Sequence, residues 1–143
     1  MKTARTLITI TLLLVAVNLV AQSTSSQRLM TVNIPFSFAA GDQAMPAGEY
    51  LVLTVTPERS IRIASTDAKH SATVNTLPNY ASQPSANSRL VFHKCCNEYF
   101  LEQVWILGQN VGRNPLSSKR AMEIASSGGR PGTVMILALA DYQ

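Results

Sequence analysis

The clearest structural signal in the sequence is a hairpin that reads RLVFHKCCNEYFLEQVWIL, from Arg89 to Leu107. Leu90 and Phe92 share one face of the first half, and Phe100, Val104 and Ile106 share one face of the second, which is typical of paired strands that bury one side. We therefore expect one strand at 89–94 and a second at 99–107. The residues between them, Cys95 to Glu98, would form an exposed tip where the chain reverses direction.

Comparable patterns recur on both sides of this hairpin. Strands with one apolar face are predicted at 30–38, 49–56, 60–64 and 72–76, and a continuous apolar run predicts a last strand at 133–140. The first of these contains Pro35, which cannot donate a ladder hydrogen bond, so we expect this strand at a sheet edge or beside a bulge. The last strand is apolar on both faces and needs cover on both sides.

The pattern changes between Asn110 and Gly128, where we expect one short amphipathic helix at about 116–125. Asn114 can cap this helix, Pro115 suits its first position and Gly128 suits its end. Its apolar face would cover one side of the last strand. Together these elements predict a mainly β fold, a small antiparallel barrel or sandwich of about seven strands with one short helix before the last strand.

The N-terminus has the three parts of a secretory signal peptide. Lys2 and Arg5 are followed by an apolar run at 7–20 and then by the small residues Ala21 and Ser23 around Gln22. A permanent membrane anchor is the alternative, but the run is short for a bilayer core that needs about 20 residues. We therefore predict a signal peptide at 1–23, a single β-rich domain at 24–143, and export to the periplasm or the medium, with no transmembrane segment after cleavage.

The charge pattern gives little support for a nucleic-acid partner. The whole chain has a formal net charge of +4, and part of that charge lies in the predicted signal peptide. The remaining basic residues are scattered, and no aromatic residues alternate with a basic stripe. The acidic residues show no spacing that would pair two carboxylates, as in glycosidases. The sequence also has no Gly-x-Ser-x-Gly elbow and no phosphate loop, so we assign no catalytic residue and no cofactor.

The hairpin tip His93-Lys94-Cys95-Cys96 is the one cluster that suggests chemistry, and three interpretations compete. A metal site would need neighbouring cysteines to reach one ion and a fourth ligand that is not evident, so we predict none. A cysteine nucleophile would need a base and an oxyanion site. The third interpretation is a hairpin tip on which Cys95 and Cys96 are exposed thiols or form a disulfide, either with each other or between two chains.

Several motifs resemble a group of short secreted bacterial β-rich proteins whose function is unknown. They are VNIPFSF at 32–38, MPAGEY at 45–50, LVFHK at 90–94, YFL at 99–101 and Trp105. The resemblance covers nearly all of the chain after the signal peptide. It implies a bacterial exported β-domain, and it implies no catalytic residue, because none is established for that group.

These observations favour a non-enzymatic exported protein that binds a small ligand or a partner in the cell envelope through a barrel mouth or a sheet face. The alternative is a small extracytoplasmic redox or hydrolytic enzyme that uses His93, Cys95 and Cys96. A disulfide-linked dimer is a further outcome that the exposed tip would allow.

Overall fold

The structure is a computed structural model that describes residues 26–57, 59–128 and 132–137. The predicted signal peptide at 1–23 and the predicted end of the last strand at 138–140 lie outside these residues. The described residues form ten strands and one helix: β1 (Gln27–Ile34), β2 (Phe38–Ala40), β3 (Gln43–Met45), β4 (Gly48–Thr56), β5 (Ser60–Ser65), β6 (Ser71–Tyr80), β7 (Arg89–Cys95), β8 (Glu98–Trp105), β9 (Val111–Pro115), α2 (Lys119–Ser126) and β10 (Gly132–Leu137).

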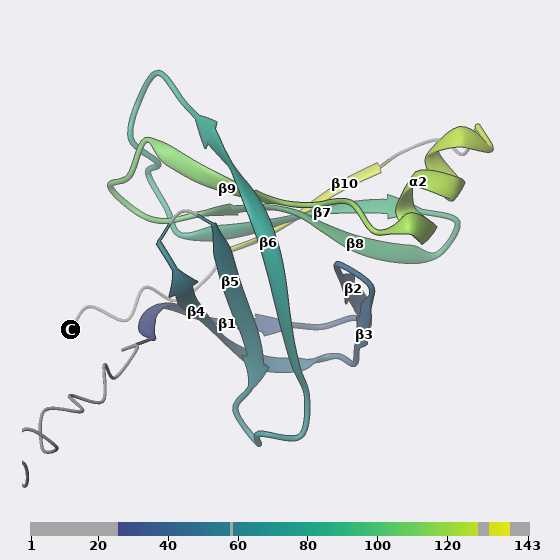
Figure 1. Cartoon of the computed structure of the whole chain (residues 1–143), viewed down its shortest axis with the longest axis horizontal. Coiled ribbons are helices and arrows are strands. Elements are labelled where there is room, and N and C mark those ends of the chain that lie inside the picture. Colours follow the sequence, from purple (N-terminus) through teal and green to yellow (C-terminus); the bar gives the residue numbers. More distant parts are fainter. Residues whose placement is uncertain (1–25, 58, 129–131, 138–143) are drawn as a thin grey trace, which may run out of the picture.

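The strands belong to one sheet that is not closed into a barrel. Its neighbours follow the order β1-β4-β5-β6-β9-β8, with antiparallel pairing along this path. On its other edge β8 pairs with β7, which in turn pairs with β10. Figure 1 shows the sheet folding over, so that β5 and β6 cross the direction of β7, β8 and β10.

The short hairpin of β2 and β3 is attached to β8 at the side on which β9 also pairs. β2 runs parallel to β8 and meets it at Ala39 and Phe100. β9 meets the same strand further along, at Val104 and Arg113. In the described part of the chain, therefore, the stretch of β8 between Phe100 and Val104 pairs with neither β2 nor β9 on this side.

The predicted mainly β fold with one short helix before the last strand is confirmed, but about seven strands was too few. The expected strand at 30–38 is divided, because β1 ends at Ile34 just before Pro35 and β2 begins at Phe38. β3 has only three residues, too few to show alternation. β9 lies in the segment where the sequence predicted a helix, and its pairing with 76–80 also lengthens β6 beyond its predicted end.

The helix begins later than predicted because Asn114 and Pro115 pair with β6 as the end of β9. The cap is Ser118, whose Oγ accepts a hydrogen bond from the Ala121 backbone N–H at 3.0 Å. The prediction that the helix covers the last strand was wrong. No side chain of α2 is buried, and Met135 on β10 is 55% exposed.

In Figure 1 the helix stands at one end of the molecule, beside the tip of the β7–β8 hairpin. It has eight residues, and no helix in the described ranges is long and apolar enough to cross a membrane.

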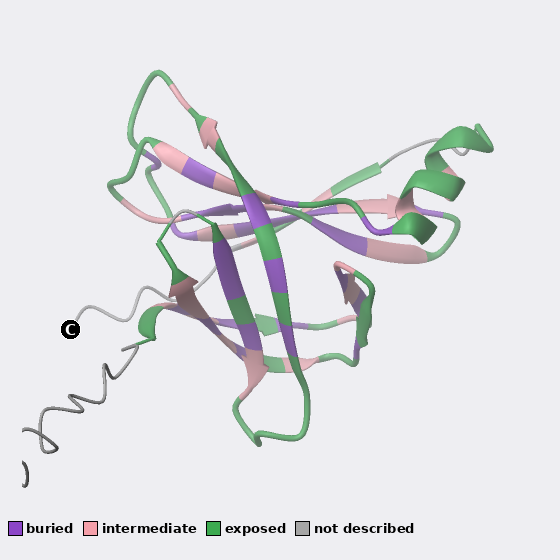
Figure 2. Cartoon of the chain, viewed as in Figure 1, coloured by how far each residue is buried: buried purple, intermediate pink, exposed green. Residues whose placement is uncertain are grey.

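The core lies between the folded halves of the sheet, where buried residues alternate with exposed ones along the strands (Figure 2). On β4, for example, Tyr50 and Val52 are buried, whereas Leu51 and Leu53 are only half-buried and Glu49 is exposed. Phe92 of β7 is at the centre, with ring centroids 5.2 Å from Phe36 and 5.4 Å from Phe38. Edge-to-face contacts of this kind are favourable beyond the area that they bury.

Candidate functional site

Three hollows surround the turn between β2 and β3, and all three are lined by Gly41 and Ser118. We call them together the β2–β3 groove. One wall comes from the β2–β3 hairpin and another from the link between β9 and α2. The groove therefore combines residues from the first and the last third of the chain.

Gly41 allows the turn to pack closely against β6. Its φ angle is +59°, a left-handed conformation that residues with a Cβ rarely adopt. A Cβ at this position would also lie 3.0 Å from Val74 Cγ1. Both the shape of the turn and its closeness to β6 thus depend on glycine.

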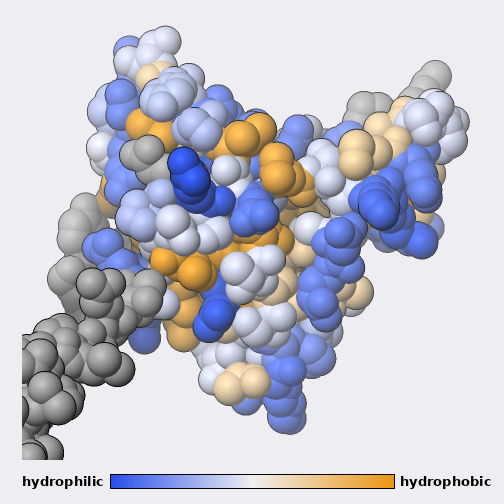
Figure 3. Space-filling model, viewed as in Figure 1, coloured by the Kyte–Doolittle hydropathy of each residue, from blue (hydrophilic) through white to orange (hydrophobic). Residues whose placement is uncertain are grey.

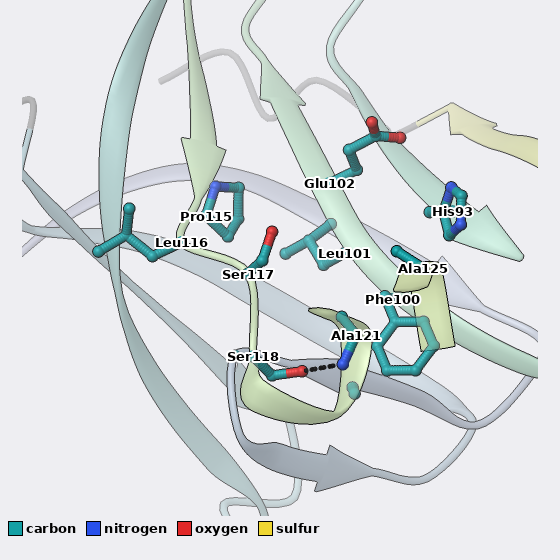
Figure 4. A pocket seen from close by; sticks show the side chains of 12 residues that line it. His93, Phe100, Leu101, Glu102, Pro115, Leu116, Ser117, Ser118, Ala121 and Ala125 are labelled. Atoms are coloured by element: carbon teal, nitrogen blue, oxygen red, sulfur yellow. Dashed lines mark hydrogen bonds between the residues drawn. The ribbon is translucent and has the colours of Figure 1, made fainter. Parts of the chain in front are cut away.

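The first hollow has a volume of about 210 Å³ and lies between β8 and the start of α2 (Figure 4). Figure 4 places Pro115 and Leu116 at one end and His93 and Glu102 at the other, with Leu101 between them. Glu102 is the extra residue of a β-bulge. The consecutive residues Val91 and Phe92 pair with Gln103 and Leu101, which leaves Glu102 between these two partners unpaired. Bulges re-aim side chains and are common beside binding sites.

The second hollow is larger, about 410 Å³, which is within the usual size range of small-molecule sites. Its lining is mainly apolar, with a polar group at one end. The apolar side chains come from both hairpins and are Phe38, Ala39, Ala44, Met45, Tyr99 and Phe100. The polar end includes Arg120, Glu98 and Ser118.

The third hollow has a volume of about 420 Å³ and a more polar lining, which includes Asp42, Gln43, Thr73 and Asn75. It lies on the β6 side of the turn, where Ser71 to Asn75 line it. Figure 3 shows the hydropathy of one face of the molecule. On this face hydrophilic residues gather at the α2 end, and apolar residues lie nearer the middle, around β5, β6 and β9.

A bidentate ion pair between Arg120 and Glu98 ties α2 to the hairpin tip. The Arg120 Nε–H donates to Glu98 Oε2 at 2.7 Å, and a second bond joins Arg120 Nη2 to Glu98 Oε1. The hydrogen bonds from Arg120, together with its positive charge, lower the pKa of the Glu98 carboxyl below its ordinary value of 4.5. At neutral pH the wall of the second hollow is therefore an intact ion pair.

At the hairpin tip, Cys96 and Asn97 have positive φ angles of +55° and +67°. Two such residues between the paired Cys95 and Glu98 are typical of a type I′ turn. The turn places the two thiols differently from the expectation that both are exposed. Cys96 is exposed, whereas Cys95, which is still part of β7, is only 2% exposed.

The two sulfurs lie 3.4 Å apart and are hydrogen-bonded rather than covalently joined. That hydrogen bond raises the pKa of the Cys95 thiol above its ordinary value of 9.0, and burial and the charge of Glu98 raise it further. Among the described residues no group of three or more His, Cys, Asp and Glu side chains is arranged to hold a metal ion.

The residues singled out from the sequence thus divide between two places. His93 lines the first hollow together with Glu102, whereas neither cysteine lines any of the three hollows. Sequence reasoning missed the groove itself, including Gly41, Ser118 and Arg120. The glycine in the Gly41-Asp42 turn was the one local signal that could have pointed to it.

Comparison with known proteins gives no relative for this arrangement. No protein-family model, no curated protein and no solved structure matches the chain. The resemblance to short secreted bacterial proteins therefore stays a prediction from motifs.

Proposed function

We propose that this chain is a non-enzymatic exported protein that binds a small, mainly apolar ligand in the β2–β3 groove. The observation that carries the proposal is the second hollow, where aromatic and aliphatic side chains from both hairpins surround a space of about 410 Å³. Pockets of this size and composition, with a few convergent polar groups, are typical of small-molecule sites.

The polar end of this hollow suggests how a ligand would be oriented. Arg120 and Glu98 form an ion pair that is half open to solvent, with side-chain exposures of 68% and 38%. A ligand with a carboxylate or sulfonate could share the Arg120 guanidinium, which offers more donors than Glu98 uses. We therefore expect a ligand with an apolar body and one anionic or polar group.

The alternative enzyme gains no support from the contacts. A cysteine nucleophile would need to lie beside a substrate pocket, and neither thiol lines any of these three hollows. His93 and Glu102 share the first hollow, but its volume of about 210 Å³ is below the usual range for a drug-sized ligand.

The test uses the dye 1-anilinonaphthalene-8-sulfonate, which combines an aromatic body with one anionic group. Wild-type protein should give saturable fluorescence enhancement. The substitution Ala44→Trp fills the second hollow from an exposed position, and we expect it to weaken dye binding at least about tenfold, which corresponds to about 1.4 kcal/mol.

The matched control is Ala86→Trp, because Ala86 is also exposed but lines none of the three hollows. It should bind the dye as the wild type does. Equal binding by Ala44→Trp and Ala86→Trp, or no saturable binding by the native wild type, would contradict the proposal.

A further inference from the structure

The tip of the β7–β8 hairpin presents two neighbouring thiols of unequal accessibility. The Cys96 side chain is exposed on the turn, and the Cys95 side chain is 2% exposed in the same hairpin. Their sulfurs are 3.4 Å apart. This arrangement separates a thiol that external reagents can reach from one that only its neighbour can reach.

Accessibility decides which thiol reacts first with an external disulfide. Exchange requires a thiolate that can approach the disulfide in line, and access is one of the factors that set its rate. Cys96 meets the access requirement, whereas Cys95 is covered and its raised pKa keeps it protonated.

Proximity decides what happens next. Once Cys96 carries a mixed disulfide, the Cys95 sulfur lies next to the bond that has to be broken, so the second step is intramolecular and has a high effective concentration. The product, however, is a disulfide between adjacent residues. Their Cα atoms are about 3.8 Å apart across a trans peptide, which is shorter than the about 4.4 Å at the lower end of ordinary disulfides. Such a bond is strained and easily reduced.

We propose that Cys96 is a modification site for small-molecule disulfides and that Cys95 removes the modification by displacing it. In the first step the Cys96 thiolate attacks a disulfide RSSR, so that a Cys96–SR bond forms, the S–S bond of RSSR breaks and one thiolate leaves. In the second step the Cys95 thiol gives its proton to solvent and attacks Cys96 Sγ, and the second thiolate leaves. The two cysteines lose two electrons together, and RSSR is reduced to two thiols.

The turn geometry adds a physical reason for reversibility. Cys96 occupies a left-handed position that favours glycine, so the reduced tip already holds a strained residue. Adding a strained disulfide to it makes the oxidised form a poor end state in the presence of free thiols. The same displacement would act on a disulfide between the Cys96 residues of two chains, so a linked dimer should not accumulate in the wild type.

The experiment treats the full reduced protein with 5,5′-dithiobis(2-nitrobenzoate) and follows both the released thionitrobenzoate and the mass of the chain. Wild-type protein should release two equivalents per chain and retain no adduct. The variant Cys95→Ser should release one equivalent and retain one adduct. The variant Cys96→Ser should react at least about tenfold more slowly than the wild type when folded, and at an ordinary rate in denaturant.

Cys95→Ala provides a second variant if serine is not tolerated at the buried position, and circular dichroism verifies that each variant is folded. A wild-type chain that stops after one equivalent with one retained adduct would show that Cys95 does not displace. Two retained adducts would show that the thiols react independently. Fast reaction of folded Cys96→Ser would show that Cys95 is not protected, and each of these results overturns the proposal.

Discussion

Replacing Gly112 with alanine tests how the outer face of the sheet is packed, because the new methyl group would meet the Trp105 ring. A Cβ at position 112 would lie 2.8 Å from two ring carbons and 2.9 Å from a third. Real Cβ atoms do not approach other carbons so closely. Either the ring remains under strain or it moves away.

Both outcomes have a cost that can be worked out from the contacts. Overpacking of a buried ring costs about 1–3 kcal/mol. If the ring moves, its Nε1–H loses the hydrogen bond to Gln103 Oε1 at 2.8 Å, about 1 kcal/mol, and its contact with the Arg89 guanidinium at 5.3 Å, about 0.5–1 kcal/mol. Alanine in a strand recovers about 0.5–1 kcal/mol relative to glycine. We therefore expect Gly112→Ala to lower the free energy of unfolding by about 0.5–2 kcal/mol.

Trp105 is the only tryptophan in the chain, so its emission reports directly on this site. Denaturant unfolding followed by fluorescence gives the change in free energy, and a red shift in the native emission shows that the ring has moved. Gly132→Ala is the matched control, because a Cβ there would be 3.8 Å from Lys94 Cβ, an ordinary contact. If Gly112→Ala is as stable as Gly132→Ala and its emission is unchanged, the packing argument is wrong.

Two further predictions concern the attachment of α2. Because Arg120 lowers the pKa of Glu98, the stabilisation from this pair is complete above pH 4.5 and is lost as the pH falls through the lowered value. The protection factors of the α2 amides, which compare each exchange rate with its intrinsic rate at the same pH, should therefore fall over that acidic range in the wild type and in Lys119→Gln, but should lack this step in Arg120→Gln. Ser118→Ala removes the N-cap acceptor and should destabilise the helix by about 1 kcal/mol, with faster exchange at Ala121. Since α2 buries no residue, that loss should leave the midpoint of global unfolding nearly unchanged, and an equal loss of global stability would refute the local interpretation.

The hairpin at 89–107 could be predicted from the sequence because its signals are local. Each strand has an apolar face, and the observed β7 and β8 differ from the predicted ranges by only one or two residues. The face assignment was right for the first arm, since Leu90 and Phe92 are fully buried in the core. On the second arm Leu101 joins the core in place of Phe100, because the extra residue Glu102 shifts the alternation. What this pattern could not show was the length of the turn, which is set by backbone angles at Cys96 and Asn97.

The helix boundary was missed because two sets of signals overlap. Asn114 followed by Pro115 has the composition of a helix start, but these two residues pair with Leu77 and Thr76 of β6. Tertiary pairing therefore overrides a local preference. The next residue able to cap is Ser118, and the helix begins directly after it.

The groove could not be predicted in the same way, because it lies where two strands, β2 and β9, pair with the same neighbouring strand, β8. β2 and β9 both pair with the same edge of β8, one at Phe100 and the other at Val104. They run in opposite directions relative to β8, and among the described residues neither of them pairs with the stretch of β8 between these two points. The bulge at Glu102 falls within that stretch, and Glu102 lines the first hollow together with the link from β9 to α2. No residue type marks such a junction in the sequence, since it depends on contacts between segments about 60 residues apart. The second hollow, which carries the proposed binding site, adjoins this junction, because Ala39 and Phe100 line it at the point where β2 meets β8. Ala44→Trp tests that hollow directly.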